Sequence, residues 1–232
     1  MIAAHFVDGD AHAIFDVAVS AVSPLHADAV GAIVEGVAAH GYAVAPAFLD
    51  MPAIGVLRVR ARGLEREGLF ASAGVGRGPG WTQRIDVRGD RIHWLDDVTP
   101  DPAFAPVRDG LEALRVAINR ELVLGLFEFE GHYACYPAGA RYARHKDRFR
   151  DSDARVLSIV LYLNDSWRAE DGGALRLFVD ERTTIDVVPT GGTLVTFLAD
   201  RFEHEVLPAK RLRISLAGWF RRRASGTQPT EC

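Results

Sequence analysis

The chain has 232 residues, of which 48% are hydrophobic and 25% charged, a composition typical of a soluble globular protein with one well-buried domain or, as the alternative, two small ones. The formal net charge of -4 argues against a general nucleic-acid-binding surface, which requires an excess of Lys and Arg. With only two cysteines, Cys135 and Cys232, a disulfide framework is not expected, and the acidic residues that interrupt the apolar N-terminus argue against a signal peptide or membrane span. We therefore predict a cytoplasmic protein that contacts neither nucleic acid nor membrane.

Helices are predicted mainly in the first half of the chain. Apolar residues recur every three or four positions in the first and third of three predicted helices, which is the spacing of one helical face. Gly41 follows the first of these helices, where a helix C-terminal cap is expected. Residues 1–24 show no clear period. The predicted elements are helices over residues 27–40, 52–67 and 102–127 and a strand over residues 42–49.

A glycine-rich stretch follows the second predicted helix. Glycine alternates with other residues from Gly74 to Gly80, just before Trp81. A phosphate-binding loop must follow a strand and open a helix, and no helical pattern follows here. We therefore predict a mobile loop over Gly74 to Arg84.

Strands are predicted in the second half of the chain. Apolar runs, separated by Gly, Pro, Asn and Asp, cover residues 127–136, 155–163, 174–179, 184–188, 193–198 and 213–221. Several short strands of this kind are typical of a sandwich or barrel. The last residues, 223–232, form a polar tail that we expect to be frayed. No repeat or linker indicates a second domain.

Two histidines and one aspartate have the residue types and order of a metal site. In the triplet His145-Lys146-Asp147, alternation along a strand would point the first and third side chains to the same side, where they could hold one ion. His204 could complete a set of two imidazoles and one carboxylate, which suits non-haem Fe(II) and its oxygen chemistry. Arg213, one strand further, could bind a carboxylate through two nitrogens, which suggests a dicarboxylate cosubstrate. The alternative is a surface turn and an unrelated histidine.

Six ordered motifs around these residues resemble those of a known family. They are Ala134-Cys135-Tyr136-Pro137, Arg141-Tyr142-Ala143-Arg144-His145-Lys146-Asp147, Tyr162-Leu163-Asn164, Gly172-Gly173-Ala174-Leu175-Arg176-Leu177-Phe178, His204-Glu205-Val206 and Arg213-Ile214-Ser215. In this order they resemble the 2-oxoglutarate and Fe(II)-dependent prolyl hydroxylases, above all the hypoxia-inducible-factor type and its bacterial relatives. The string Val87-Arg88-Gly89-Asp90-Arg91-Ile92-His93-Trp94 looks like the strand before the catalytic core in that subgroup.

The resemblance implies a mainly β fold with flanking α-helices. A double-stranded β-helix of the jelly-roll type would be buttressed by N-terminal helices. We expect a single domain over residues 1–232, with helical support and a substrate lid to about residue 125, the β core over about 126–222 and then the tail. The lid would be the Gly74 to Arg84 loop, which in the family folds over a peptide substrate; a plain exposed loop is the alternative.

The resemblance also implies roles for individual residues. Fe(II) would be held by His145, Asp147 and His204, and the retained aspartate indicates hydroxylation rather than halogenation. The cosubstrate 2-oxoglutarate would be bound by Arg213, Tyr162 and Tyr136. The substrate would be contacted by Arg88, Asp90, Tyr142 and Trp219. Ala217 departs from the animal members, which carry a hydroxyl residue near this place.

Several of these assignments have a purely structural alternative. Tyr162 could be a core residue with its hydroxyl bonded to backbone, and Tyr136 and Tyr142 could be half-buried strand residues. Arg88 and Asp90 could be solvated charges on a turn with Gly89 in a left-handed conformation. The other histidines lack metal-binding neighbours in sequence, so we expect them at the surface or with satisfied hydrogen bonds; they are His5, His12, His26, His40, His93 and His132.

The reaction that the resemblance implies is hydroxylation of a prolyl residue in a protein. The cosubstrates would be 2-oxoglutarate and O2, the other products succinate and CO2, and ascorbate would support activity. We expect a monomer, and the bacterial relatives suggest a translation elongation factor as the target. The rival among enzymes is a hydroxylase of a free amino acid or small metabolite. A non-catalytic metal-binding sensor module is the alternative from another class.

Overall fold

The computed structural model describes residues 25–74, 82, 84, 86–95, 101–148 and 154–223. Three sequence predictions lie wholly or mostly outside this part of the chain: the unassigned segment 1–24, the Gly74 to Arg84 loop and the tail 223–232. Within the described residues, no helix is both long and apolar enough to cross a membrane.

Three helices form one layer of the molecule. They are α1 (Leu25–His40), α2 (Met51–Arg66) and α3 (Ala105–Leu122), the last preceded by the short 3-10 helix η2 (Pro102–Phe104). The predicted first helix and its glycine cap are confirmed, because Gly41 has φ 84° and donates its N–H to the Val37 carbonyl at 2.9 Å. At the start of α2, the Asp50 side chain accepts a hydrogen bond from the Ala53 N–H at 2.9 Å.

The third predicted helix was too long at its C-terminal end. It stops at Leu122, because Val123 and Gly125 take left-handed conformations with φ 53° and 69° and turn the chain into the next strand. The Asn119 side chain holds this turn: it donates to the Leu126 carbonyl at 2.7 Å and accepts from the Leu126 N–H at 2.8 Å. Leu126 still packs into the same core, which explains why the apolar spacing runs on past the helix.

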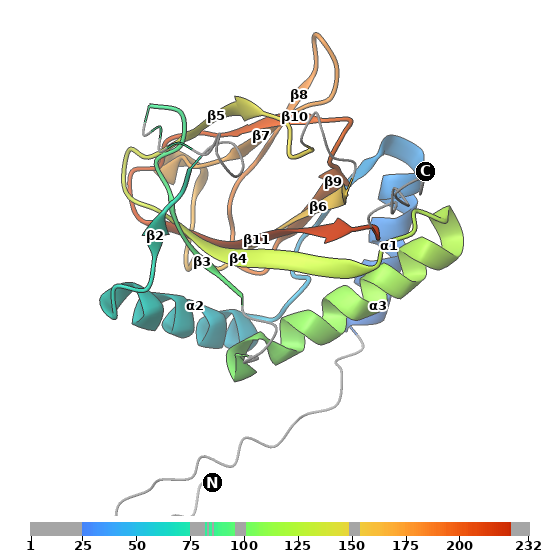
Figure 1. Cartoon of the computed structure of the whole chain (residues 1–232), viewed down its shortest axis with the longest axis horizontal. Helices are drawn as coiled ribbons and strands as arrows, with labels where there is room; N and C mark the ends of the chain where they lie inside the picture. The colour runs from blue at the N-terminus through green and yellow to red at the C-terminus, as the bar shows by residue number, and fades with distance from the viewer. Residues whose placement is uncertain are drawn as a thin grey trace, which may run out of the picture.

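The strands form two antiparallel sheets that face each other (Figure 1). The larger sheet has the order β1-β9-β6-β11-β4-β3-β2 and the smaller β5-β10-β7-β8. The larger contains β1 (Tyr42–Ala45), β2 (Ala71–Ser72), β3 (Arg91–Trp94), β4 (Glu128–Tyr136), β6 (Arg155–Tyr162), β9 (Leu194–Leu198) and β11 (Arg213–Arg221), and the smaller β5 (Tyr142–His145), β7 (Leu175–Phe178), β8 (Thr184–Val187) and β10 (Glu203–Val206). The predicted double-stranded β-helix is confirmed, with the helices on the outer face of the larger sheet (Figure 1).

The strand predictions differ from the structure mainly where strands are short. The six strands predicted in the second half match observed strands to within one residue at each end. The strand predicted over 42–49 ends at Ala45, because Ala47 has φ 53° and the Phe48 N–H bonds to the Gly192 carbonyl at 2.8 Å. Strands β2 and β10, of two and four residues, had no predicted counterpart.

The central strands divide their side chains between two cores. On β4, Tyr133 and Cys135 pack toward the helices, whereas Ala134 and Tyr136 pack toward the smaller sheet. This alternation is expected for a strand that is buried on both faces. The side chains that point between the two sheets are therefore the ones that can build a site.

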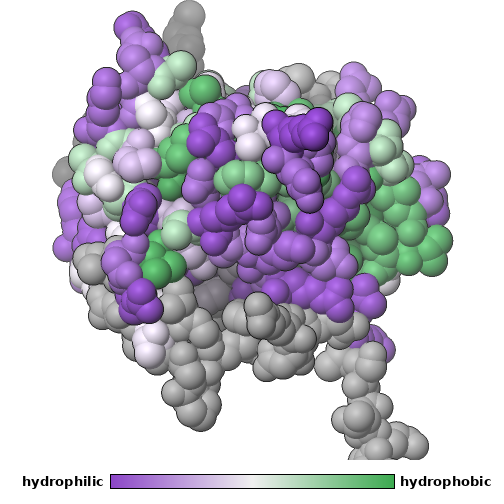
Figure 2. Space-filling view, turned by 90° about the horizontal axis from the view of Figure 1, so that it is seen from above, coloured by the Kyte–Doolittle hydropathy of each residue, from purple (hydrophilic) through white to green (hydrophobic). Residues whose placement is uncertain are grey.

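The outer surface of the smaller sheet is polar. Figure 2 views the molecule from this side and shows mostly hydrophilic residues. On this sheet, Arg176 pairs with Asp186 at 2.7 Å and with Glu205 at 3.6 Å, and Arg144 pairs with Glu203. The smaller sheet thus has one solvated face and one face turned toward the larger sheet.

Candidate metal centre and cosubstrate pocket

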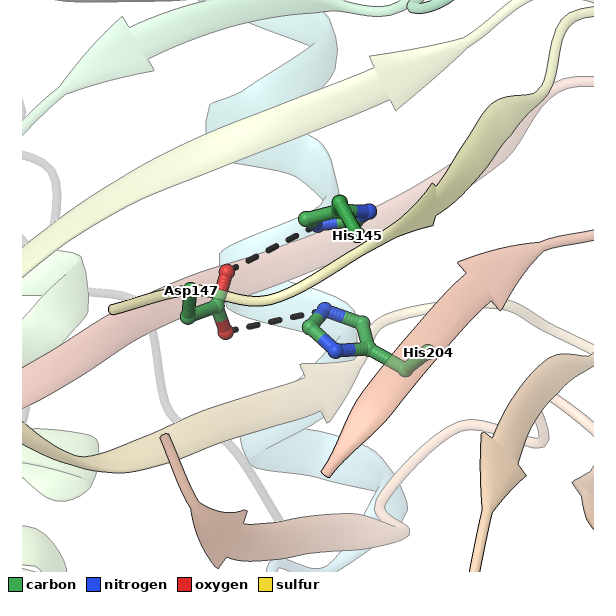
Figure 3. A group of neighbouring side chains, drawn as sticks. All are labelled: His145, Asp147 and His204. Carbon is green, nitrogen blue, oxygen red and sulfur yellow. Dashed lines mark ion pairs between the residues drawn. The ribbon is translucent and has the colours of Figure 1, made fainter. Parts of the chain in front are cut away.

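Three side chains converge between the two sheets. His145 ends β5 and His204 lies in β10, and the two residues are direct partners in this strand pair. Asp147 approaches both: its Oδ1 lies 3.6 Å from Nε2 of His145, and its Oδ2 lies 3.6 Å from Nε2 of His204 (Figure 3). One ligand atom of each residue lies within 4.8 Å of the others. Strand pairing therefore brings the three sequence-predicted residues together.

The expected position of the aspartate needs a correction. Strand β5 ends at His145, so Asp147 does not share a strand with that histidine, as the alternation argument assumed. The carboxylate reaches the site from the segment after the strand. Ser158 on β6 holds it there, because its hydroxyl donates to Oδ2 at 2.7 Å.

Neighbouring groups orient the ligand atoms. Nδ1 of His145 lies 2.7 Å from the Ala143 carbonyl, which directs Nε2 toward the site. Burial lowers the pKa of His204 to about 4, although Asp147 opposes the shift. Burial alone would raise the pKa of Asp147, but His204, His145 and Ser158 hold it well below its ordinary value. Neutral imidazoles and an ionised carboxylate are the forms that bind a metal.

The donor set fits a divalent iron ion. Two imidazole nitrogens and one carboxylate oxygen are typical of non-haem Fe(II) sites that keep positions open for other ligands. The space for such ligands is a cavity of about 280 Å³, which the three residues line together with Tyr136 and Arg213.

Arg213 is a buried cation in this cavity. It is 1% exposed, and among the described residues no carboxylate pairs with it. Its Nε donates to the Gly173 carbonyl at 2.9 Å and its Nη1 to the Ser215 hydroxyl at 3.3 Å. A buried charge without a counterion is costly, so the site fits an anionic ligand such as the second carboxylate of 2-oxoglutarate.

Two tyrosines enclose this guanidinium. Their ring centroids lie 5.0 Å (Tyr136) and 5.1 Å (Tyr162) from the Arg213 guanidinium carbon. The hydroxyl of Tyr162 is buried and has no hydrogen-bond partner within the described part of the chain, so the alternative of a hydroxyl satisfied by backbone is wrong. Burial raises the pKa of Tyr162 to about 12, against the influence of Arg213. Tyr162 lies behind the cavity wall, whereas Tyr136 forms part of it.

Arg88 and Asp90 form a buried pair beside the metal centre. The guanidinium binds both carboxylate oxygens, at 2.7 and 2.9 Å, and the two side chains are 13% and 0% exposed. The alternative of two solvated charges on a left-handed glycine turn is therefore wrong, and Gly89 has no positive φ. Arg88 lies over the Tyr142 ring at 4.6 Å, and Tyr142 stacks on His145 with centroids 3.6 Å apart. A continuous stack thus joins this pair to a candidate ligand.

The far end of the cavity contains an aromatic cluster. Trp219 lines the cavity together with His132 and Arg155. The Arg155 guanidinium lies 3.3 Å over the Trp219 ring and pairs with Glu130 at 2.7 Å. Sequence reasoning missed Arg155, Ser158 and His132 as site residues. His132 could have been found by alternation, since it lies two and four residues before Ala134 and Tyr136 on β4.

Comparison with known proteins agrees with this geometry. The model of the 2OG-Fe(II) oxygenase superfamily matches residues 131–221. Human prolyl hydroxylase EGLN3 is 30% identical over 181 residues, which cover 71% of this chain and 70% of that protein. Human Egl nine homolog 1 is 32% identical over 144 residues, which cover 58% of this chain and 33% of that protein. The chain thus matches about a third of the length of this second relative.

Solved structures show the same similarity. A Pseudomonas putida prolyl-4-hydroxylase has 42% identity and a TM-score of 0.76, covering 84% of this chain and 100% of that one. A prolyl hydroxylase from Trichoplax adhaerens, solved with a hypoxia inducible factor peptide fragment, has 25% identity and a TM-score of 0.79, covering 88% and 94%. The extent of these matches shows that the chain belongs to the family of 2-oxoglutarate and Fe(II)-dependent prolyl hydroxylases.

Proposed function

We propose that this protein is a single-domain dioxygenase that hydroxylates a prolyl residue in a protein, with 2-oxoglutarate and O2 as cosubstrates. One observation carries the proposal. A single cavity contains two histidines and an aspartate in metal-binding geometry, together with a buried arginine that has no carboxylate partner among the described residues. The two histidines and the aspartate suit Fe(II), and the arginine suits a dicarboxylate.

His145, Asp147 and His204 would hold the iron. When bound, Fe(II) supplies the oxidising chemistry that couples conversion of 2-oxoglutarate to succinate and CO2 with insertion of one oxygen atom into the substrate. The protein contributes orientation. Ser158 fixes one carboxylate oxygen, and the Ala143 carbonyl fixes the tautomer of one imidazole.

Arg213 would bind the distal carboxylate of 2-oxoglutarate. Its Nη2 has no hydrogen bond in the described part of the chain, and its Nη1 has only a long one, to Ser215. A fork of this kind matches a carboxylate in a bidentate way. Tyr162, whose ring centroid lies 5.1 Å from the guanidinium carbon, would offer its unpartnered hydroxyl to the same ligand, and the Tyr136 ring lines the cavity beside the guanidinium.

The other four expected site residues would form the substrate side of the cavity; Asp90, which is buried and does not line it, would act through Arg88. Arg88 and Asp90 hold the segment before β3 against β5, through a backbone bridge between Arg88 and Tyr142. Tyr142 presents its ring between this segment and His145. Trp219 lines the cavity and provides an apolar wall that suits a proline ring.

The target would be a prolyl residue in a polypeptide. The Trichoplax adhaerens relative was solved with a hypoxia inducible factor peptide fragment, which supports a peptide substrate here. On the resemblance to bacterial relatives, we propose a translation elongation factor in the cytoplasm as the first candidate and a monomer as the active form.

Mass spectrometry of a treated lysate tests the function. A bacterial cytosolic lysate would be incubated with the protein, Fe(II), ascorbate and 2-oxoglutarate. The negative control is His145→Ala, and the matched control is His93→Ala on β3, whose ring contacts the Leu69 carbonyl outside the cavity. We expect one prolyl peptide to gain one oxygen with the native protein and the His93 variant, and not with the His145 variant.

Two other outcomes would contradict the proposal in different ways. If free amino acids or metabolites gain oxygen while no peptide does, the enzyme acts on a small molecule. If 2-oxoglutarate is not converted to succinate under any condition, the protein is a metal-binding module rather than a hydroxylase.

A further inference from the structure

The cavity has two chemically different ends along β11. Side chains of alternate residues face it in the order Arg213, Ser215, Ala217 and Trp219, a span of about 20 Å at the usual rise of a strand. The Arg213 end fits a carboxylate. At the other end, Trp219 is the register partner of Ser158, which binds Asp147. The Trp219 end therefore lies beside the metal centre on the side away from Arg213.

His132 is a buried polar side chain at this second end. It is 2% exposed, lines the cavity and lies between its two register partners, Trp94 on β3 and Ala217 on β11. Its ring centroid is 4.8 Å from that of Trp94 and 5.6 Å from that of Trp219. Its Nδ1 is buried without a hydrogen-bond partner among the described residues. The sequence-based expectation of a surface or satisfied histidine is wrong here.

A second unpartnered nitrogen lies next to it. Nε1 of Trp219 is also buried without a hydrogen-bond partner in the described ranges. Arg155 lies over the Trp219 ring, pairs with Glu130 and also lines this end of the cavity. Ala217, the register partner of His132 on β11, has only a methyl side chain and also lines the cavity.

The polar groups at this end are mostly hydrogen-bond donors. The Trp219 indole and the Arg155 guanidinium can only donate, and a neutral imidazole has one N–H. Burial, with Arg88 and Arg155 acting in the same direction, lowers the pKa of His132 to about 3, so the ring is neutral at physiological pH. A ligand that fits here must supply acceptors. The amide that precedes a proline has a carbonyl oxygen and no N–H.

We propose that His132 is a positioning residue for the substrate: its N–H donates a hydrogen bond to the carbonyl oxygen of the amide that precedes the target proline, with the Trp219 N–H as a neighbouring donor. This subsite rests on the proposed function and deepens it, because it gives a reason for choosing proline. The groups at this end mostly donate hydrogen bonds, so the amide N–H of any other residue would lack an acceptor there. It holds the peptide on the side of the metal centre opposite to the cosubstrate.

Binding to short peptides tests the subsite without turnover. The protein would be loaded with Zn(II) and 2-oxoglutarate and titrated with Ac-Ala-Pro-Ala-NH2, with tryptophan fluorescence as the readout. A second peptide would carry a thioamide in place of the amide before proline, because sulfur is a poor acceptor. The variants are His132→Phe, which keeps an aromatic ring, His132→Gln, which keeps a donor, and His93→Phe on the neighbouring strand as the matched control.

We expect the loss of one hydrogen bond, about 5- to 10-fold in affinity. His132→Phe should weaken binding of the amide peptide by this factor and should no longer distinguish it from the thioamide peptide. His132→Gln should recover most of the affinity, and His93→Phe should behave like the native protein. The ring ¹⁵N signals of His132 should move on addition of the amide peptide.

Three results would overturn the subsite. The first is a His132→Phe variant that binds as tightly as the native protein or still discriminates against the thioamide. The second is an equal loss of affinity for Zn(II) or 2-oxoglutarate, which would indicate a structural role. The third is native protein that binds Ac-Ala-Ala-Ala-NH2 as well as the proline peptide. The lysate experiment decides separately whether prolyl hydroxylation itself stands, since it does not depend on these peptides.

Discussion

The two faces of the larger sheet treat buried groups in opposite ways. Toward the helices, β4 and β11 present Tyr133 and Leu216 to a continuous apolar core. Toward the smaller sheet, the same strands present His132, Arg213 and Ser215, all buried and all polar. Neighbouring residues of one strand therefore face an apolar core on one side and, on the other, a cleft in which buried polar groups stand among apolar side chains.

The cleft face concentrates polar atoms that lack a partner. Four of the seven unpartnered buried side-chain atoms in the described part of the chain belong to residues at the cleft: His132, Tyr162, His204 and Trp219. Leaving such an atom unsatisfied costs about 1–3 kcal/mol. The helix-facing side thus contributes to stability, whereas the unpartnered polar atoms at the cleft lower it. Ligands that bind these atoms would restore that free energy.

The largest effect is expected from removing the carboxylate at the cleft. Asp147→Ala should abolish metal-dependent 2-oxoglutarate turnover, by more than about 1,000-fold, because the ligand set loses its only charged member. Iron content by elemental analysis and succinate release measure this. Ser158→Ala is the matched control: it removes one hydrogen bond to the same carboxylate and should cost about 10- to 100-fold. Native iron affinity in the Asp147 variant would exclude that residue as a ligand.

The helix-facing side should respond in stability instead. Leu216 is fully buried on β11, and Leu216→Ala should lower the free energy of unfolding by about 2–5 kcal/mol because it leaves a cavity. Urea unfolding measures the loss. The KM for 2-oxoglutarate should stay unchanged at temperatures where the variant is folded. Val59→Ala, at an exposed position of α2, should change stability by less than about 0.5 kcal/mol. A changed KM in the Leu216 variant would mean that the two faces are coupled.

The sequence predicted the framework better than the site's details. The long helices and the strands of the larger sheet have repeated apolar spacings, so their positions follow from periodicity. Strand β10 has four residues and carries a polar candidate ligand, His204, which leaves too short and too mixed a pattern to detect. The end of α3 depends on a left-handed valine and an asparagine side-chain bridge, and apolar spacing carries no signal for either.

The site residues likewise divide into those that local sequence predicts and those that only the folded structure brings together. His145, Asp147, His204 and Arg213 were predicted because their motifs are local in sequence. His132 was not, because its neighbours come from β3 and β11, which are distant in the chain and adjacent only through strand pairing. The burial of the Arg88–Asp90 pair likewise depends on how the sheet edge folds and cannot be read from the local sequence Arg88-Gly89-Asp90.

Replacing Arg213 should sharpen the comparison between the two faces of the larger sheet, because the change should weaken ligand binding without lowering stability. Arg213→Met should raise the KM for 2-oxoglutarate by about 100-fold, in line with the loss of a buried ion pair. The unfolding free energy of the ligand-free variant should be unchanged or higher, because a buried cation without a counterion is removed. Steady-state kinetics and urea unfolding measure the two quantities. Arg211→Met, two residues away and paired with Asp171 at 3.1 Å, should leave the KM unchanged.

The smallest effect concerns pH and tests whether the cleft face keeps His132 neutral. The pKa of His132 is about 3 in the folded protein, against an ordinary 6.5, so between these values the unfolded chain binds more protons. The folded state must therefore lose stability as pH falls below about 6.5, by at most about 1.4 kcal/mol per pH unit for this one group. Urea unfolding of the metal-free protein at pH 7, 6 and 5 should show a shallower pH dependence for His132→Phe than for the native protein. Equal slopes would mean that His132 takes up a proton in the folded state, and a charged ring would then bring a cation to the end of the cavity that already contains Arg155.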